Sequence, residues 1–593
     1  MKQSVFNLNT LKAHPERNAF DLSHNDVFSC APGMLLPISC TEVLPNEHYE
    51  INPQVFLRTM PLNSAAYVRM RQHVEFFFVP TRVLLRQFPQ FVVGTKYPIS
   101  SLDTLNAFSE SLPSVALSTL RDVYEKLGSS TDGLGIPSKY GSLRLFDLLG
   151  YGINSSRNIN ANTYPDKYSI DGSSTNLQTS PSLSILRAAA YQKVYQDYFR
   201  NPYWEPADAS IFNFDDKFGQ KLVSDVKDDL DRLLNLFTLR YRNWTKDFFT
   251  SLQPQFQGAP FVTSNVNMSN FMTTDTSSNG MNFLPNTFLT DLRSDLPSKS
   301  SSSSDMAGLS VLTTPSTQGA LSIPVHNIRA AFALDKLYRL QQQAGNGSYG
   351  EQIRNRFGFG GVHDDWKSQY IGGSSAPISI GEVITTANTV LSSDDAPLGQ
   401  TGDIYGKASS VNDGKFVFDT KEHGIILGIF SVIPDADYNS TQIDPHNFKL
   451  NFEQFFQPEF DRLGHQPLNT YFLSCLAPYS GSGQSDTENK GWVQRVLGFQ
   501  NRYLEYKTGI DRVHGQFCSG GSLSAWTAPR NSGILSINSS YYNLYSLKVS
   551  PKILNSICSV TFDGTEKTDP ILVDSHISIK AIRPMSVSDE PLL

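Results

Sequence analysis

Short β-rich runs that end at proline are the feature that most constrains the fold of this chain. Gln72–Pro80 and Gly424–Pro434 are both of strand length and both stop at Pro. Ile577–Ala581 alternates apolar and polar residues with the period of two that is typical of a half-buried strand. Tyr542–Val549 is a further strand candidate, and Gly424–Pro434 is apolar enough to be buried. The sequence therefore predicts a fold built mainly from strands.

Helical spacing is confined to three segments between these runs. Leu183–Tyr198, Phe218–Phe237 and Val325–Gln342 each place apolar residues three or four apart, which predicts an amphipathic helix. Pro202 and Gly345 provide the stop signals for the first and third segments. Short strands with long, partly helical connections favour a β-sandwich or jelly roll with large insertions.

One long stretch has a composition that cannot build a core. Residues 263–322 are dominated by Ser, Thr and Asn, and Ser300–Ser304 is an unbroken serine run. We expect a surface insertion here, because long segments of this kind inside folded proteins usually have a function.

Charge and aromatic content exclude several classes of protein. Charged residues make up 18% of the 593 residues, where about 25% is usual. The chain also has 38 Phe and 25 Tyr, which excludes a disordered protein. Its net charge of −7 has the wrong sign for a coat that neutralises phosphates by itself. With so few charged residues, much of the surface must be uncharged, and its role needs an explanation.

Motifs for catalysis or metal binding are missing. The five Cys show no C-x-x-C spacing and are expected to be buried, reduced thiols, and the eleven His show no H-E-x-x-H. Near-matches to a phosphate-binding loop at Gly406 and to a calcium loop at Asp435 both lack required residues. We therefore predict no catalytic, metal-binding or cofactor-binding residue, no cofactor and no enzyme activity. The N-terminus has no apolar signal segment, and no run of about 18 apolar residues predicts a membrane span.

Basic and aromatic residues interleave between Arg495 and Lys507. Arg495, Arg502, Tyr503 and Lys507 could clamp and stack single-stranded bases. The other interpretation of this segment is a strand edge or a protein interface. Arg69 and Arg71 are weaker candidates for nucleic-acid contact.

Four blocks of residues, in order along nearly the whole chain, carry a resemblance to a known family. They are Phe20–Ser23 with Gly33–Ile38, Glu42–Pro45 and Phe76–Arg82; Arg187–Arg200 with Arg242–Thr250; Ile328–Phe332 with Tyr349–Ile353 and Tyr370–Gly373; and Pro458–Asp461 with Gly498–Lys507 and Gly515–Phe517. With these blocks the chain resembles the major capsid proteins of small single-stranded DNA bacteriophages of the Microviridae, most closely the gokushovirus-like branch. Two departures are Asn46-Glu47, where relatives often have Gly-Asp, and a segment Leu504–Gln516 that is less basic than in relatives.

The resemblance implies an eight-stranded antiparallel viral jelly roll with long, partly helical inserted loops. It also implies pentamers that form a T=1 icosahedral shell around the circular genome, in a virion assembled in the cytoplasm of a host bacterium. A surface insertion of such proteins forms a protrusion near the threefold axes that is thought to meet the host. We place it at 263–322, with Asn267, Phe271, Asn279, Phe283 and Ser302 as candidate host-attachment residues.

The implied partners are further copies of the chain, a small basic DNA-packaging protein, a minor pilot protein, an internal scaffolding protein, the packaged single-stranded DNA and a host surface receptor. The negative net charge agrees with a separate basic protein that neutralises the genome. The uncharged, aromatic surface agrees with contacts between copies.

The expected organisation follows from these assignments. It comprises an N-terminal arm with the first jelly-roll strands at 1–95, inserted loops with helices at 96–262, the surface insertion at 263–322, a helix with connecting loops at 323–420, and C-terminal jelly-roll strands with an arm at 421–593. A soluble carbohydrate-binding or carbohydrate-active β-sandwich remains the alternative.

Overall fold

The chain divides into two units, Met1–Gln255 with Asp365–Leu593, and Phe256–Asp364. A computed structural model describes residues 17–85, 88–93, 112–127, 131–132, 134–152, 167–170, 173–176, 182–208, 232–254, 366–384, 404–461, 464–469, 472–473, 496–530, 547–564 and 569–587. All of these belong to the first unit. The predicted insertion 263–322, with its five candidate residues, and the predicted helix 325–342 lie outside the described residues.

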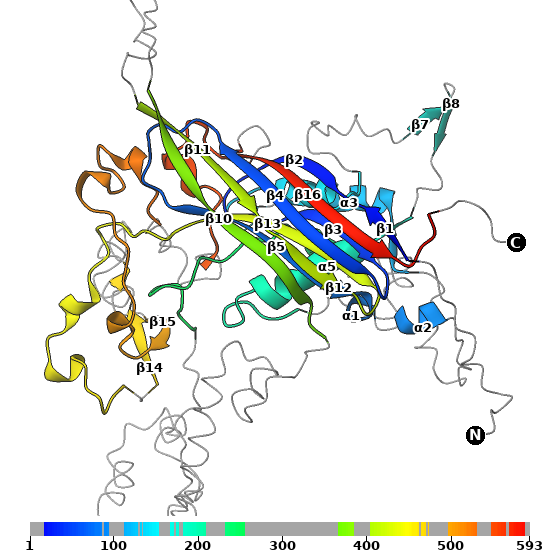
Figure 1. Ribbon diagram of the computed structural model, residues 1–593. Coiled ribbons are helices and arrows are strands. Elements are labelled where there is room, and N and C mark those ends of the chain that lie inside the picture. The colour runs from blue at the N-terminus through cyan, green and yellow to red at the C-terminus, as the bar shows by residue number, and fades with distance from the viewer. Residues whose placement is uncertain are drawn as a thin grey trace, which may run out of the picture. The chain divides into compact units, whose positions relative to one another are not determined.

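The main element is an antiparallel sheet in which the strands follow the order β1-β16-β4-β11-β10-β5-β13-β3 (Figure 1). Two further strands, β12 and β2, pair with β4 and β16. The bounds of these strands are β1 Asn18–Asp21, β2 His24–Cys30, β3 Leu36–Val43, β4 His48–Thr59, β5 Met70–Pro80, β10 Gln369–Ile384, β11 Ile404–Asp413, β12 Phe416–Asp419, β13 Gly424–Pro434 and β16 Ile571–Arg583.

Strand β10 joins two layers of this sheet. Its first part, Gln369–Ile378, pairs with β5, and its second part, Ser379–Ile384, pairs with β11. The sheet therefore curls, with β5, β13 and β3 in one layer and β16, β4 and β11 in the other. The mainly β, jelly-roll expectation is confirmed.

Burial follows from this layering. Strand β16 alternates buried and exposed residues, because one face meets the core and the other meets solvent. Strand β13 is buried at every position, because both of its faces are covered. Phe430 packs in the core between the layers, while Leu427 packs on the opposite face with Phe77. The predictions of a half-buried strand at Ile577–Ala581 and a buried strand at Gly424–Pro434 are confirmed.

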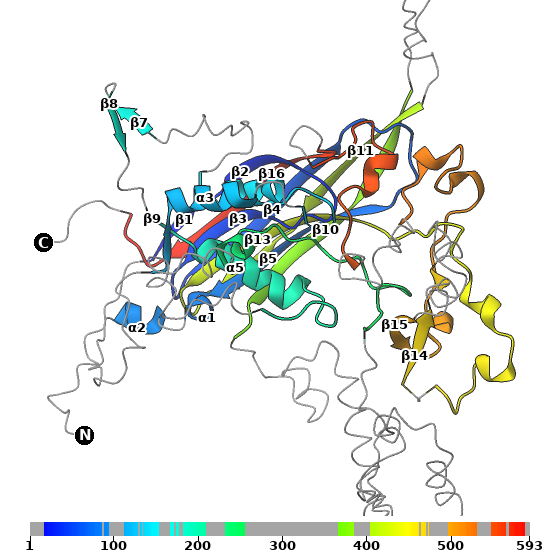
Figure 2. The same cartoon turned by 180° about the vertical axis from the view of Figure 1, so that it is seen from behind.

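Helices cover the opposite face of β5 and β13 (Figure 2). The largest are α3 (Leu117–Leu127), α4 (Ser138–Leu148) and α5 (Leu186–Val194), and α5 continues as the π-helix η2 (Tyr195–Phe199). The smaller elements of this region are α1 Thr81–Leu84, α2 Phe88–Val93, β6 Ser114–Ala116 and β9 Ser182–Ser184. β7 (Lys167–Ile170) and β8 (Ser173–Asn176) form a separate two-stranded pair.

The helix predicted at 183–198 is confirmed from residue 186 onward. Of the second predicted helix only the end is described, where Leu233 and Phe237 are buried. The described end of the strand predicted at Tyr542–Val549 is not a strand, since Lys548 forms only an isolated bridge with Asn243.

Buried polar groups fasten β16 to its surroundings. Arg144 of α4 and the hydroxyl of Tyr140 both donate to Asp569, just before β16. The side chains of Arg144 and Asp569 are 8% and 3% exposed, so the pair is shielded from water. At the other end of β16, Arg583 lies 3.1 Å from the buried carboxylate of Glu47.

The four described cysteines are free thiols. Cys30, Cys518 and Cys558 are buried as expected, Cys40 is half-buried, and Cys475 lies outside the described residues. Burial raises the pKa of Cys558 to about 12, which keeps it a neutral thiol. Among the helices that the structure describes, none is both long and apolar enough to cross a membrane.

Candidate functional site

The predicted basic–aromatic segment lies in a group of loops that we call the loop cluster, formed by residues 444–461, 464–469 and 496–512. Its framework is the antiparallel pair β14 (His465–Asn469) and β15 (Val496–Asn501). Three 3₁₀ turns complete it: η6 (Pro445–Phe448), η7 (Phe452–Gln454) and η9 (Leu504–Tyr506). Hydrogen bonds of 2.8 Å in both directions between Gln253 and Phe499 connect β15 to the chain segment that follows the helices.

Local sequence explains the first turn of the cluster. The Asp444 side chain accepts a 2.8 Å hydrogen bond from the His446 N–H, and Pro445 occupies the first turn position, as at many helix starts. Arg512 donates to the same carboxylate at 2.8 Å. Partial burial acts to raise the pKa of Asp444, but these two hydrogen bonds outweigh it and hold the pKa below its usual value. The carboxylate therefore stays charged and ties η6 to the end of the cluster.

Tyr503 is the structural centre of the cluster. Its backbone adopts the left-handed conformation at φ 58°, which costs a non-glycine residue about 1–2 kcal/mol. The conformation is held by a hydrogen bond from the Tyr503 N–H to the Gln466 side chain at 3.1 Å and by another from its hydroxyl to the Phe455 carbonyl at 3.3 Å. The ring is 3% exposed and packs edge-on against Phe456 at 5.1 Å.

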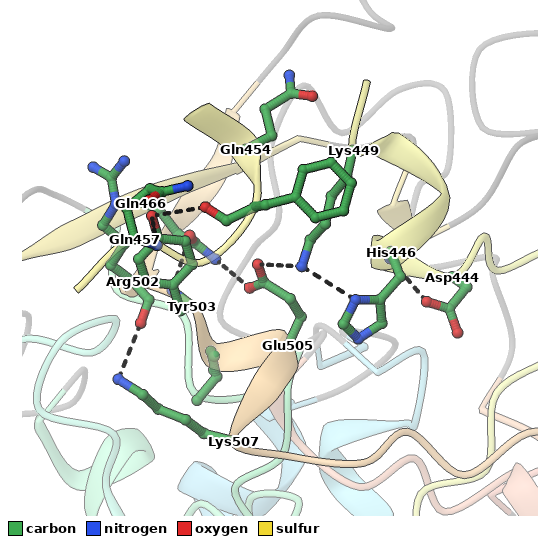
Figure 3. Close-up of polar contacts among 12 residues, drawn as sticks. Asp444, His446, Lys449, Gln454, Gln457, Gln466, Arg502, Tyr503, Glu505 and Lys507 are labelled. Carbon is green, nitrogen blue, oxygen red and sulfur yellow. Dashed lines mark hydrogen bonds and ion pairs between the residues drawn. The ribbon is translucent and has the colours of Figure 1, made fainter. Parts of the chain in front are cut away.

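Both lysines of the cluster have partners, and Figure 3 shows those of Lys449. Lys507 binds Asp461 at 2.9 Å. Lys449 lies between the His446 ring, at 3.1 Å, and the Glu505 carboxylate, at 3.5 Å.

The guanidinium of Arg502 lies over the rings of Phe460 and Tyr503, at 5.1 and 5.3 Å from their centroids. Arg69, outside the cluster, pairs with Asp437 at 2.9 Å and Asp511 at 2.8 Å. The described residues of the cluster therefore hold most of their positive charge in contacts within the chain.

Acidic residues outnumber basic ones in the cluster. Its Lys and Arg are Lys449, Arg502, Lys507 and Arg512, and its Asp and Glu are Asp444, Glu453, Glu459, Asp461, Glu505 and Asp511. Among these described residues, such a balance gives no net attraction for phosphates.

The structure brings together three of the four residues predicted to face single-stranded DNA. Arg502, Tyr503 and Lys507 lie within one turn of η9, and Arg495 lies outside the described residues. The ring of Tyr503 is buried inside the cluster, and Lys507 forms an ion pair with Asp461. Contact of these residues with DNA stays a prediction.

Sequence reasoning missed a group of exposed apolar side chains on the same cluster. We call it the aromatic face, and it consists of Leu450, Phe452, Phe455, Phe456 and Tyr506, whose exposed fractions are 83%, 78%, 50%, 45% and 47%. Four of the five fall within seven consecutive residues of a loop. That density of apolar residues, outside any helical or strand period, is the signal that could have identified it.

Comparison with known proteins gives consistent matches along the chain. A sequence model of the family described as "Capsid protein (F protein)" matches residues 9–149 and 153–592. "Capsid protein VP1" of Chlamydia phage 1 is 23% identical over 646 aligned residues, covering 97% of this chain and 95% of the relative. "Capsid protein VP1" of Bdellovibrio phage phiMH2K is 22% identical over 533 aligned residues, covering 86% and 85%.

Proposed function

The chain belongs to the phage capsid protein (F protein) family, as its resemblance to Microviridae capsid proteins predicted, and we propose that its copies form pentamers and then a T=1 shell around a circular single-stranded DNA genome. The family implies a structural role in the virion, built from many copies of the chain. The match over nearly all residues, on an antiparallel two-layer sheet, is the observation that carries the proposal.

The composition supports assembly from many copies. Interface cores are depleted in charge and enriched in Phe and Tyr, and this chain has 18% charged residues with 38 Phe and 25 Tyr. Many contacts form together in a closed symmetric shell, so the free energy that each single contact contributes can be modest.

Electron microscopy of the purified full chain tests the proposal. Uniform small icosahedra, or pentamers that convert to them, are expected. Monodisperse monomers that hydrolyse or bind glycans would contradict it and would favour the carbohydrate-active β-sandwich instead.

Genome packaging is the second part of the proposal. With a net charge of −7 the shell cannot neutralise DNA by itself, so a small basic DNA-packaging protein supplies the positive charge. A minor pilot protein and an internal scaffolding protein complete the expected partners. Arg495, Arg502, Tyr503 and Lys507 are the candidate inner-face contacts, and alanine variants that package DNA as well as the parent would show that this choice is wrong.

Host attachment is the third part. The segment 263–322 is proposed as the surface protrusion near the threefold axes that meets a host receptor, on the basis of its Ser, Thr and Asn content and its position between predicted helices. Replacing it with a short linker should leave particle assembly intact and abolish adsorption to host cells. Normal adsorption of such particles would refute the attachment role.

A further inference from the structure

We infer that the aromatic face of the loop cluster is a contact surface for a second copy of this chain within the shell. The inference rests on the proposed assembly and adds to it a named surface, formed by Leu450, Phe452, Phe455, Phe456 and Tyr506.

The size of the aromatic face fits a protein contact. With about 200 Å² for each side chain, the five exposed fractions leave roughly 600 Å² of largely apolar surface. Monomeric proteins rarely expose a contiguous apolar patch much larger than a few hundred Å² without using it. A standard interface buries about 800 Å² on each partner, so this face could supply more than half of one.

The charges around the face favour a protein over a nucleic acid. Lys507 is neutralised by Asp461 at 2.9 Å, and Lys449 by Glu505 at 3.5 Å. Single-strand binding needs free cations along the phosphates in addition to rings that stack on bases. An exposed apolar surface whose neighbouring lysines are already paired within the chain is better suited to a protein contact.

The face is also held rigidly before any partner binds. The Gln454 side-chain oxygen accepts hydrogen bonds from the backbone N–H groups of Leu450 and Asn451, at 2.5 and 3.0 Å, which fixes the loop that carries Leu450 and Phe452. Phe456 and Tyr506 pack edge-on at 6.2 Å around the buried Tyr503. A surface ordered in advance loses less conformational entropy when it binds.

The chain carries a second apolar surface that a neighbouring copy could offer in return. Neighbouring copies in a ring meet through two different surfaces of the same chain. The paired ends of β10 and β11 expose Val383 and Tyr405, at 50% and 38%, on one face, and Ile384 and Ile404, at 58% and 41%, on the other. Each face of this strand pair therefore offers two apolar side chains to a neighbouring copy.

The test compares two double variants of the full chain. Leu450→Ser with Phe452→Ser removes the most exposed part of the face, while Leu450→Met with Phe452→Leu keeps it apolar and serves as the matched control. Because both side chains are at least 78% exposed, neither variant should change the thermal midpoint of the unassembled protein. Assembly is followed against concentration by sedimentation velocity and electron microscopy, and DNA contact by fluorescence anisotropy with a 30-residue oligothymidine.

The serine variant should need at least about tenfold more protein for half-assembly, the control should match the parent, and oligothymidine binding should be the same in all three. Serine variants that assemble like the parent would overturn the inference but leave the proposed shell intact. If they assemble normally but lose oligothymidine binding, the face contacts DNA and the inference is wrong. A parent chain that stays monomeric at every concentration would contradict the proposed shell, and the inference with it.

Discussion

Glu47 offers a direct test of how the last strand is held in the jelly roll. Its buried carboxylate accepts hydrogen bonds from the Leu44 N–H at 2.7 Å and the Tyr49 hydroxyl at 2.6 Å, and its other oxygen lies 3.1 Å from the Arg583 guanidinium. Glu47→Gln keeps the volume of the side chain but removes the charge. Arg583, at the end of β16, then loses its counter-charge.

The size of the effect follows from the burial of the two partners. Removing one member of a buried ion pair usually costs about 3–5 kcal/mol, because the remaining charge is left uncompensated. The Glu47 side chain is fully buried, but that of Arg583 is 17% exposed and also donates to the Tyr49 hydroxyl at 2.8 Å. We therefore expect the lower end of that range, about 3 kcal/mol of lost stability.

Glu42→Gln in β3 is the matched control. Glu42 pairs with Arg187 at 3.5 Å, but its side chain is 73% exposed, so the same substitution should cost less than about 1 kcal/mol. Urea unfolding of the unassembled chain, followed by tryptophan fluorescence, measures both variants. Equal midpoints for Glu47→Gln and Glu42→Gln would refute the argument that the buried pair fastens β16.

Three further predictions concern the same two-layer sheet. Asn46 has a left-handed backbone at φ 63°, so Asn46→Gly should leave stability unchanged and Asn46→Val should cost about 1–2 kcal/mol in urea unfolding. Burial, helped by two nearby arginines, lowers the pKa of His73 from 6.5 to about 4, so the unfolded chain binds more protons between these values. Stability should fall by about 1–2 kcal/mol as the pH falls through that window, after allowing for the partial exposure of the ring, and His73→Gln should flatten the pH profile of the unfolding midpoint. A Cβ at Gly428 would lie 2.7 Å from the Phe76 ring, so Gly428→Ala should lower the free energy of unfolding by about 1–3 kcal/mol and lower the thermal midpoint. Gly381→Ala is the control, because the nearest atom to a Cβ there is 3.7 Å away, and its thermal midpoint should stay unchanged.

The strands were the most predictable part of the fold. Side chains on a strand alternate between its two faces, so the period of two at Ile577–Ala581 specifies one buried face whatever the rest of the chain does. The unbroken apolar run Gly424–Pro434 likewise specifies two covered faces, and β13 has them. The sequence could not say what covers the second face, because that depends on where α4 and α5 pack.

The turn at Asn46-Glu47 likewise has one feature that the sequence predicts and one that only the tertiary structure shows. The resemblance leads us to expect Gly at the first position, and Asn is a side chain that tolerates the left-handed backbone found there. That much is local and could be expected from residue type. The partner of Glu47 could not, since Arg583 lies more than five hundred residues further along the chain.

The candidate site shows most clearly what the sequence determined by itself and what only the tertiary structure decided. The sequence placed Arg502, Tyr503 and Lys507 close together and marked the segment as basic and aromatic. The tertiary structure buried the ring of Tyr503, paired Lys507 with Asp461 and left Phe452 exposed. Periodic patterns repeat over a few residues and can be read along the chain. Whether a charge is free or a ring is exposed depends instead on which distant residues the fold brings within a few ångströms of it.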